Sequence, residues 1–141
     1  MNTEAPSFEI RSADDDGKLL LVGSVPRGLT GYDGCHFDAS LVSIPLSASV
    51  RVYDIQPQNW SAFFQDLAAN WKGWSGEKRM ESLEGHLAVS ATSDSLGHVS
   101  LRVRLRDIIP GTADWCAEGT LVVEAGQLQR LADDARKFFG Q

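Results

Sequence analysis

The chain has few of the residues that carry metal or nucleophile chemistry. Its 141 residues include two cysteines and three histidines. A zinc centre needs three or four ligands in close local pairs, and the sequence has no Cys-x-x-Cys or His-x-x-x-His spacing. It also lacks a phosphate-cradling glycine loop, a dinucleotide fingerprint and a nucleophile elbow. We therefore expect no metal and no cofactor, and we expect Cys35 and Cys116 to remain reduced.

Long apolar runs are also missing. No stretch approaches the length of about 20 apolar residues that a membrane-spanning helix needs. The first six residues, MNTEAP, carry neither the basic region nor the apolar region of an export signal. The sequence therefore predicts a cytoplasmic protein that does not associate with membranes.

Basic residues are outnumbered, with 13 Lys and Arg against 19 Asp and Glu and a net charge of -6. Nucleic-acid binding depends on clustered Lys and Arg that displace counterions from the phosphate backbone, so nucleic acid is not an expected partner. The same charge favours encounter with a basic protein surface. We expect the acidic face to include Asp14 to Asp16, Glu77, Glu81 and Glu84.

What the chain does have is the composition of a packed domain. Its apolar fraction is 43% and its charged fraction is 23%, which are ordinary values for globular proteins. The length corresponds to one domain, and we assign residues 1–141 to it with residues 1–6 as a frayed, disordered start. Monomer and homodimer both remain open.

Hydrophobic periodicity predicts an α+β fold. Short segments with two-residue alternation indicate a largely antiparallel sheet of about seven to eight strands. Apolar residues at three-and-four spacing predict one central helix at about 57–71 and one C-terminal helix at about 126–139. The stripe on the central helix runs from Trp60 to Trp71 and is expected to pack against the sheet.

The stretch from Trp71 to Asp107 is expected to form a core hairpin that follows the central helix. If its turn is centred on Ser95, Leu101 faces Val89 and Arg106 faces Glu84, which gives an apolar pair and a charge pair.

Candidate binding residues lie in the same stretch. Alternation places Arg102, Arg104 and Arg106 on the outward face of one strand, an unusual row of cations in an acidic protein. This row is either a solvated face balanced by glutamates or a site for an anion or a partner. With the neighbouring polar and aromatic side chains, the candidate set is His98, Arg102, Arg104, Arg106, Glu84 and Trp74.

The landmarks Trp71-x-Gly-Trp74, Glu84-Gly-x-Leu87, Gly97-His98-Val99, Trp115 and Val123-Glu-x-Gly-x-Leu128 resemble a small bacterial family of unknown function that is common in actinomycetes. The resemblance implies a shared fold and transfers no catalytic residue. The compact acidic form is also similar to immunity-type proteins, which neutralise bacterial toxins.

Three hypotheses for the function follow. The first is a non-catalytic protein-binding module of immunity type that docks an acidic face on a basic partner. The second is a ligand-binding or enzymatic pocket between the sheet and the helix at 57–71, in which His98 and Arg102 hold an anion. The third is a structural subunit of a homodimer.

Overall fold

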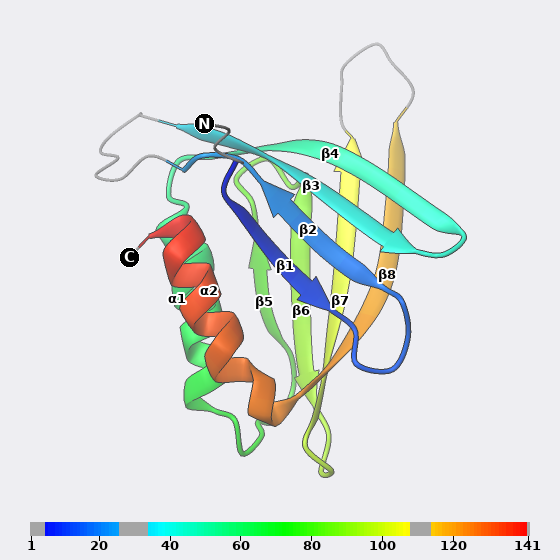
Figure 1. The fold of residues 1–141 in the computed structure, drawn as a ribbon, viewed down its shortest axis with the longest axis vertical. Helices are drawn as coiled ribbons and strands as arrows, with labels where there is room; N and C mark the ends of the chain where they lie inside the picture. Colours follow the sequence, from blue (N-terminus) through cyan, green and yellow to red (C-terminus); the bar gives the residue numbers. More distant parts are fainter. Residues whose placement is uncertain (1–4, 26–33, 108–113, 141) are drawn as a thin grey trace.

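The computed structural model describes residues 5–25, 34–107 and 114–140. Four strands are followed by a helix, and four further strands by a short 3-10 helix and a second α-helix (Figure 1). The elements are β1 (Ser7–Arg11), β2 (Lys18–Val22), β3 (Cys35–Ser43), β4 (Leu46–Asp54), α1 (Gln58–Ala69), β5 (Lys78–Glu81), β6 (Leu87–Ser93), β7 (His98–Asp107), β8 (Trp115–Glu124), η1 (Ala125–Gln127) and α2 (Leu128–Phe139).

The strands form two four-stranded antiparallel sheets, in the orders β1-β2-β3-β4 and β5-β6-β7-β8. The predicted α+β fold, with one central and one C-terminal helix, is confirmed. Alternation sets the two faces of each sheet, because successive side chains on a strand point to opposite sides. In β7, Leu101, Val103 and Leu105 are fully buried, whereas Arg102 and Arg106 are exposed.

An aromatic cluster between the helices and sheets makes one core from the two halves. Helices α1 and α2 pack against each other, and each also contacts the first strand of the other half's sheet, α1 on β5 and α2 on β1. Phe8 contacts Phe64 at 5.2 Å and Phe139 at 5.9 Å between ring centroids, and Trp60 stacks on Phe139 at 6.1 Å. The buried apolar area of these rings is a principal stabilising contribution.

The β1–β2 turn joins the two sheets at one end. The amide of Ala13 donates to the carbonyl of Val122 at 2.7 Å, and the amide of Val122 donates to the hydroxyl of Ser12 at 3.1 Å. These bonds satisfy main-chain groups at the outer edge of β8. Beyond them β8 ends at Glu124 and the chain turns into η1.

The β6–β7 hairpin forms as expected, but with a different register. Val89 pairs with Val103, and Ala91 pairs with Leu101, so the predicted pair of Leu101 and Val89 is wrong by two residues. The turn residue Gly97 has a φ of 84°, which favours glycine. A shift of two residues keeps every side chain on its predicted face.

The central helix ends two residues before the predicted position of about residue 71. Helix α1 ends at Ala69, and the amide of Gly73 closes a turn by donating to the carbonyl of Asn70 at 2.8 Å. Trp71 therefore lies outside the helix and is 56% exposed. The rest of the predicted stripe is buried as expected.

Of the segment 1–6, residues 1–4 lie outside the described part of the chain, and the carbonyl of Pro6 accepts a hydrogen bond from Gly23. No helix in the described ranges is long and apolar enough to cross a membrane. Cys35 and Cys116 are both free.

Candidate binding surfaces

The outward side of the β5–β8 sheet carries the row of arginines, and we call this surface the arginine face. Its charged residues alternate with the buried positions of the strands, so the core contacts of Leu101, Val103 and Leu105 fix the direction in which the arginines point. The charged residues of the arginine face are Glu77, Arg79, Glu81, Arg102, Arg104, Arg106, Asp114 and Glu118.

Ion pairs hold most of these arginines. The Nη2 of Arg104 lies 3.5 Å from Glu81 Oε1, and the Nη2 of Arg79 lies 3.3 Å from Glu81 Oε2. Arg106 lies 3.8 Å from Asp114, so the predicted charge pair of Arg106 with Glu84 does not form. The Nε of Arg104 is buried and has no hydrogen-bond partner in the described structure.

Arg102 differs from the other three because it forms no ion pair or hydrogen bond with any described residue. Its neighbours across the ladder are Ser90 on β6 and Thr120 on β8, which are short side chains. Two hollows of about 120 Å³ each meet at Arg102, one towards Arg104 and the other towards Ser100. An exposed guanidinium among short side chains offers its donors to an incoming acceptor.

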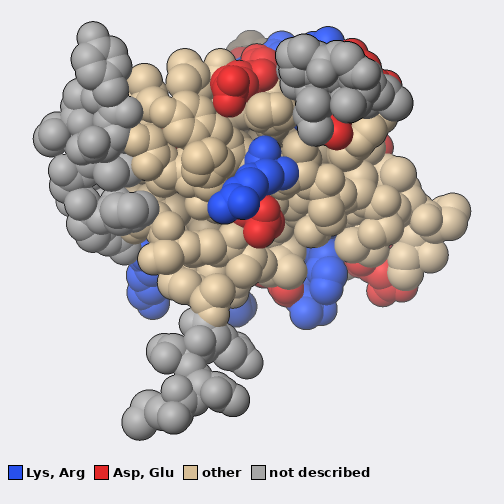
Figure 2. Space-filling view, turned by 90° about the horizontal axis from the view of Figure 1, so that it is seen from above, with Lys and Arg blue, Asp and Glu red and all other residues tan. Residues whose placement is uncertain are grey.

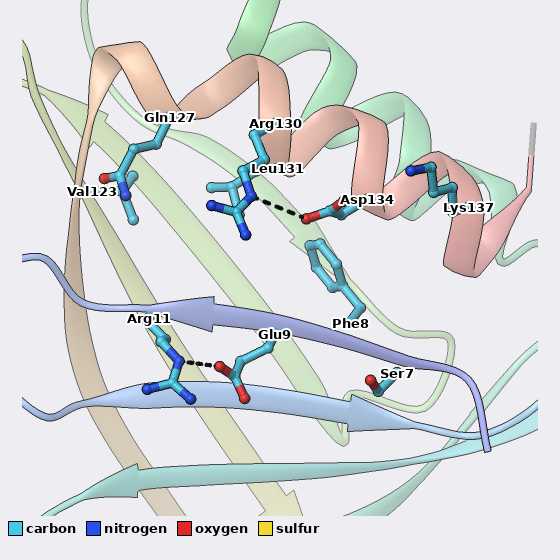
Figure 3. A pocket seen from close by; sticks show the side chains of 10 residues that line it. All are labelled: Ser7, Phe8, Glu9, Arg11, Val123, Gln127, Arg130, Leu131, Asp134 and Lys137. Atoms are coloured by element: carbon cyan, nitrogen blue, oxygen red, sulfur yellow. Dashed lines mark hydrogen bonds and ion pairs between the residues drawn. The ribbon is translucent and has the colours of Figure 1, made fainter. Parts of the chain in front are cut away.

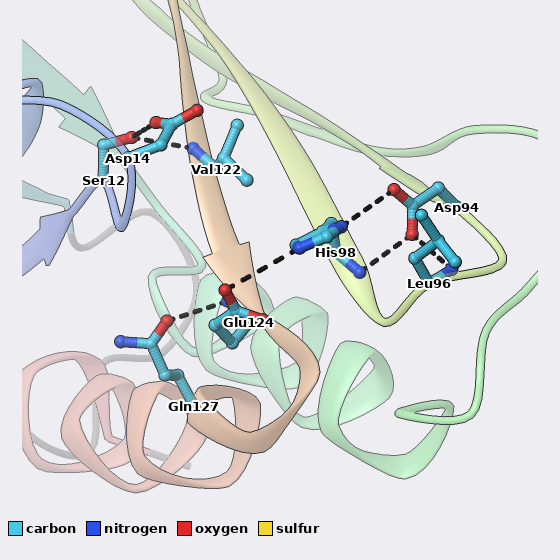
Figure 4. A network of polar contacts seen from close by, with 8 residues as sticks. All are labelled: Ser12, Asp14, Asp94, Leu96, His98, Val122, Glu124 and Gln127. Carbon is cyan, nitrogen blue, oxygen red and sulfur yellow. Dashed lines mark hydrogen bonds and ion pairs between the residues drawn. The ribbon is translucent and has the colours of Figure 1, made fainter.

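His98 lies at the start of β7, away from the centre of the arginine face. Its Nδ1 is 3.1 Å from Asp94 Oδ2 and its Nε2 is 3.8 Å from Glu124 Oε1 (Figure 4). Four residues of strand separate His98 from Arg102, which corresponds to about 13 Å. A single small anion therefore cannot contact both side chains.

The carboxylate of Asp94 organises the β6–β7 turn. It accepts hydrogen bonds from the amides of His98 at 2.9 Å and Leu96 at 2.8 Å. The His98 amide, followed by that of Leu96, lowers the pKa of Asp94, and the His98 side chain adds to the effect. The role of His98 and Asp94 in this turn is local and structural.

Trp74 and Glu84 lie apart from the arginine row. The indole Nε1 of Trp74 donates to the carbonyl of Ala91 at 3.2 Å, and its ring packs against the core. Glu84 is exposed in the turn between β5 and β6. Of the six predicted site residues, the structure therefore groups Arg102, Arg104 and Arg106.

The acidic residues that the sequence suggested as one face are divided. Asp14 to Asp16 lie in the β1–β2 turn beside β8, whereas Glu77 and Glu81 lie at β5, on the opposite edge of the sheet. The three strand spacings between β5 and β8 correspond to about 14 Å. Figure 2 shows the upper end of the molecule, where isolated charged side chains of both signs stand among uncharged atoms.

Cys35 and His36, which are adjacent in the sequence, do not form a nucleophile and its base. Cys35 is buried in the core, whereas His36 points outward and its ring lies 5.0 Å from that of Tyr53. Burial, followed by the charge of Asp54, raises the pKa of the Cys35 thiol, which disfavours the reactive thiolate. No group of three or more described His, Cys, Asp or Glu residues could hold a metal ion.

A separate hollow, of about 420 Å³, lies between β1 and α2. We call it the β1–α2 groove. In Figure 3, Glu9 and Arg11 on β1 lie across from Arg130 and Asp134 on α2. Sequence reasoning missed this groove because its walls are about 120 residues apart in the chain. The exposed cations on one flank of the C-terminal helix were the only signal.

The geometry thus defines a two-sheet α+β protein with a charged sheet face and a separate groove. The chain belongs to a family described as a family of unknown function, DUF6228, whose model matches residues 13–141. A comparison with curated proteins gives no match.

Proposed function

We propose that the chain is a non-catalytic protein-binding module, and that the arginine face is its docking surface. The observation that carries the proposal is the exposed guanidinium of Arg102, which has no ion pair with a described residue and lies between Ser90 and Thr120. Arginine is enriched among the residues that dominate binding energy at protein interfaces. A carboxylate or carbonyl oxygen of a partner would complete its hydrogen bonds.

The net charge of the protein and the individual charges of the arginine face act at different stages of binding. The net charge of -6 attracts a basic protein during encounter. At contact, Arg102 requires an acceptor, whereas Glu77 and Glu118 at the edges of the hollow suit basic side chains. We accordingly extend the proposal to an immunity-type role in the bacterial cytoplasm, in which the partner is a basic toxin that the protein neutralises by occupying its surface.

A pair of matched variants tests the docking surface. Arg102→Ala and Arg51→Ala each remove one exposed arginine and change the net charge equally, but Arg51 lies on the outer face of β4 in the other sheet. Wild type and both variants are immobilised and used to capture proteins from a lysate of the source cells. Capture is then quantified by mass spectrometry.

The proposal requires one protein that wild type and Arg51→Ala retain and that Arg102→Ala retains at least tenfold less, the order expected for an interface arginine of about 1.4 kcal/mol or more. That protein, expressed alone, must arrest growth, and co-expression of the wild-type chain must restore it. Identical captured sets for the three baits would contradict docking through Arg102. Rescue by Arg102→Ala equal to that by wild type would contradict it as well.

A further inference from the structure

One edge of β1 is paired with β2, and the pairing alternates along the strand. At one end the amide of Gly23 donates to the carbonyl of Pro6 at 3.0 Å. At the other end the amide of Ser12 donates to the carbonyl of Gly17 at 2.8 Å. The register is antiparallel without interruption between these two bonds. The even-numbered residues of β1 are therefore the ones that exchange main-chain hydrogen bonds with β2.

It follows that Phe8 and Ile10 direct their amides and carbonyls towards β2, whereas Ser7, Glu9 and Arg11 direct theirs away from it. No hydrogen bond to these outward main-chain groups occurs among the described residues. Strand β8 is the nearest strand on this side. Its main chain bonds Ala13 in the turn that follows β1, and β8 then ends at Glu124. Within the described part of the chain, the edge of β1 is therefore unpaired along its length.

The open edge lies within the β1–α2 groove. Ser7, Glu9 and Arg11 all line it, and the buried side chains of Phe8 and Leu131 form part of its apolar floor (Figure 3). The opposite wall is a stripe of polar and charged residues on η1 and α2, namely Gln127, Arg130, Asp134 and Lys137.

The two walls have similar lengths. The five residues of β1 extend about 17 Å, and the ten steps from Gln127 to Lys137 along the helix extend about 15 Å. An extended segment of about five residues has the same length. Such a segment pairs its main chain with an open strand edge and places alternate side chains on the floor.

The charge of the groove selects the kind of segment. Three of the chain's 13 basic residues and two of its 19 acidic residues line it, so the groove has a net charge of +1 and the rest of the chain -7. Glu9 is paired with Arg11, and Asp134 lies 3.9 Å from Arg130. The side chains of Arg11 and Arg130 are 74% and 87% exposed, which leaves donors available on both walls.

We propose that the β1–α2 groove binds an acidic extended peptide segment, which adds as a strand to the open edge of β1. Carboxylates of the segment face Arg11 and Arg130, and its alternate apolar side chains contact Phe8 and Leu131. This site shares no residue with the arginine face. The proposal therefore goes beyond the proposed docking function and is tested independently of it.

Amide hydrogen exchange tests the proposal with a defined probe. The probe is a five-residue peptide, capped at both ends, that alternates glutamate with valine, and its control replaces each glutamate with lysine. In the free protein we expect the amides of Glu9 and Arg11 to exchange fast and those of Phe8 and Ile10 to exchange slowly, because only the latter two point towards β2. Saturating acidic peptide is expected to slow Glu9 and Arg11 at least tenfold. No slowing, or equal slowing by the lysine peptide, would overturn the proposal.

A substitution that removes a main-chain amide distinguishes strand addition from binding through charged side chains alone. Glu9→Pro removes an amide that points away from β2, so the protein is expected to fold, because edge strands tolerate proline where no ladder bond is lost. Glu9→Ala removes the same carboxylate and keeps the amide. Peptide affinity measured by titration is expected to fall at least tenfold in Glu9→Pro relative to Glu9→Ala. Equal affinities of these two folded variants would overturn strand addition.

Discussion

The outer faces of the two sheets differ in the cross-strand neighbours of their polar side chains. On the outer face of the β3–β4 pair, polar groups have complementary neighbours across the strands: the Ser40 hydroxyl bonds that of Ser49 at 2.9 Å, and Asp38 lies opposite Arg51. On the β5–β8 sheet the neighbours of Arg102 are two short side chains. Because both sheets bury the same kind of apolar face, the difference is not required for folding. This difference is the reason that we propose the docking surface on the second sheet.

The largest expected effect on stability comes from removing a core ring that both halves share. Phe8→Ala deletes the ring that contacts Phe64, Phe138 and Phe139, and thus affects both halves. The expected loss is about 3–5 kcal/mol of unfolding free energy, a large part of the stability of a small domain. Urea denaturation followed by tryptophan fluorescence and by far-UV circular dichroism should give coincident transitions. Separate transitions would show that the halves unfold independently.

A buried polar contact is confined to the first half. Asp54 Oδ2 accepts from the indole Nε1 of Trp60 at 3.0 Å, and Oδ1 accepts from the amide of Ile55 at 2.9 Å. Asp54→Ala leaves a buried indole donor unpaired, and we expect a loss of about 1–3 kcal/mol in urea denaturation. Asp54→Asn keeps an acceptor and should lose less. An equal loss in the two variants would contradict this role for the carboxylate.

Arg104 allows stability and binding to be separated on the second sheet. Its Nε is buried without a partner in the described structure, and its pair with Glu81 is partly exposed. Arg104→Met keeps the length of the aliphatic stem and removes the unsatisfied donor. We expect unfolding free energy to change by at most about 1 kcal/mol, while capture of the partner falls. A loss of stability well beyond this range would assign Arg104 to the scaffold.

The smallest effect concerns the β6–β7 turn and depends on pH. The amides of His98 and Leu96 lower the pKa of Asp94 in the folded protein. The stabilisation is therefore fully present above the unfolded pKa of about 3.9 and is lost as pH falls through the lower folded value. The midpoint of thermal unfolding should differ between wild type and Asp94→Asn at pH 6, and the difference should shrink towards pH 3. A difference that is constant with pH would contradict the role of the charge.

The element order and faces could be predicted from the sequence because they depend on local periodicity. The alternation around Leu101 and the stripe from Trp60 to Leu67 indicate which side chains are buried. The hairpin register could not be predicted in the same way, since a shift by two residues preserves the pattern. The prediction that Trp71 is part of the buried stripe was wrong, because an aromatic residue at helical spacing resembles a core residue even beyond the end of the helix.

The direction in which the candidate site residues point could be predicted in part for a similar reason. Parity alone placed Arg102, Arg104 and Arg106 on one outward face, and the structure agrees. Glu84 was included because the predicted register placed it opposite Arg106, and Trp74 because it lies in the same stretch. In the structure Glu84 lies in the β5–β6 turn, and Trp74 bonds the carbonyl of Ala91. The β1–α2 groove depends on where β8 ends relative to β1, and no local pattern encodes that distance.

The natural thiol of Cys116 offers the most direct test of the arginine face, because it is exposed on the outer side of β8 beside Arg104 and Arg106. Ser47→Cys adds a reference thiol on the exposed outer side of β4. The ratio of the alkylation rate of Cys116 to that of the reference thiol is measured in the source cells and in purified protein. Docking through the arginine face predicts a ratio at least severalfold lower in cells; the same ratio in both would contradict it.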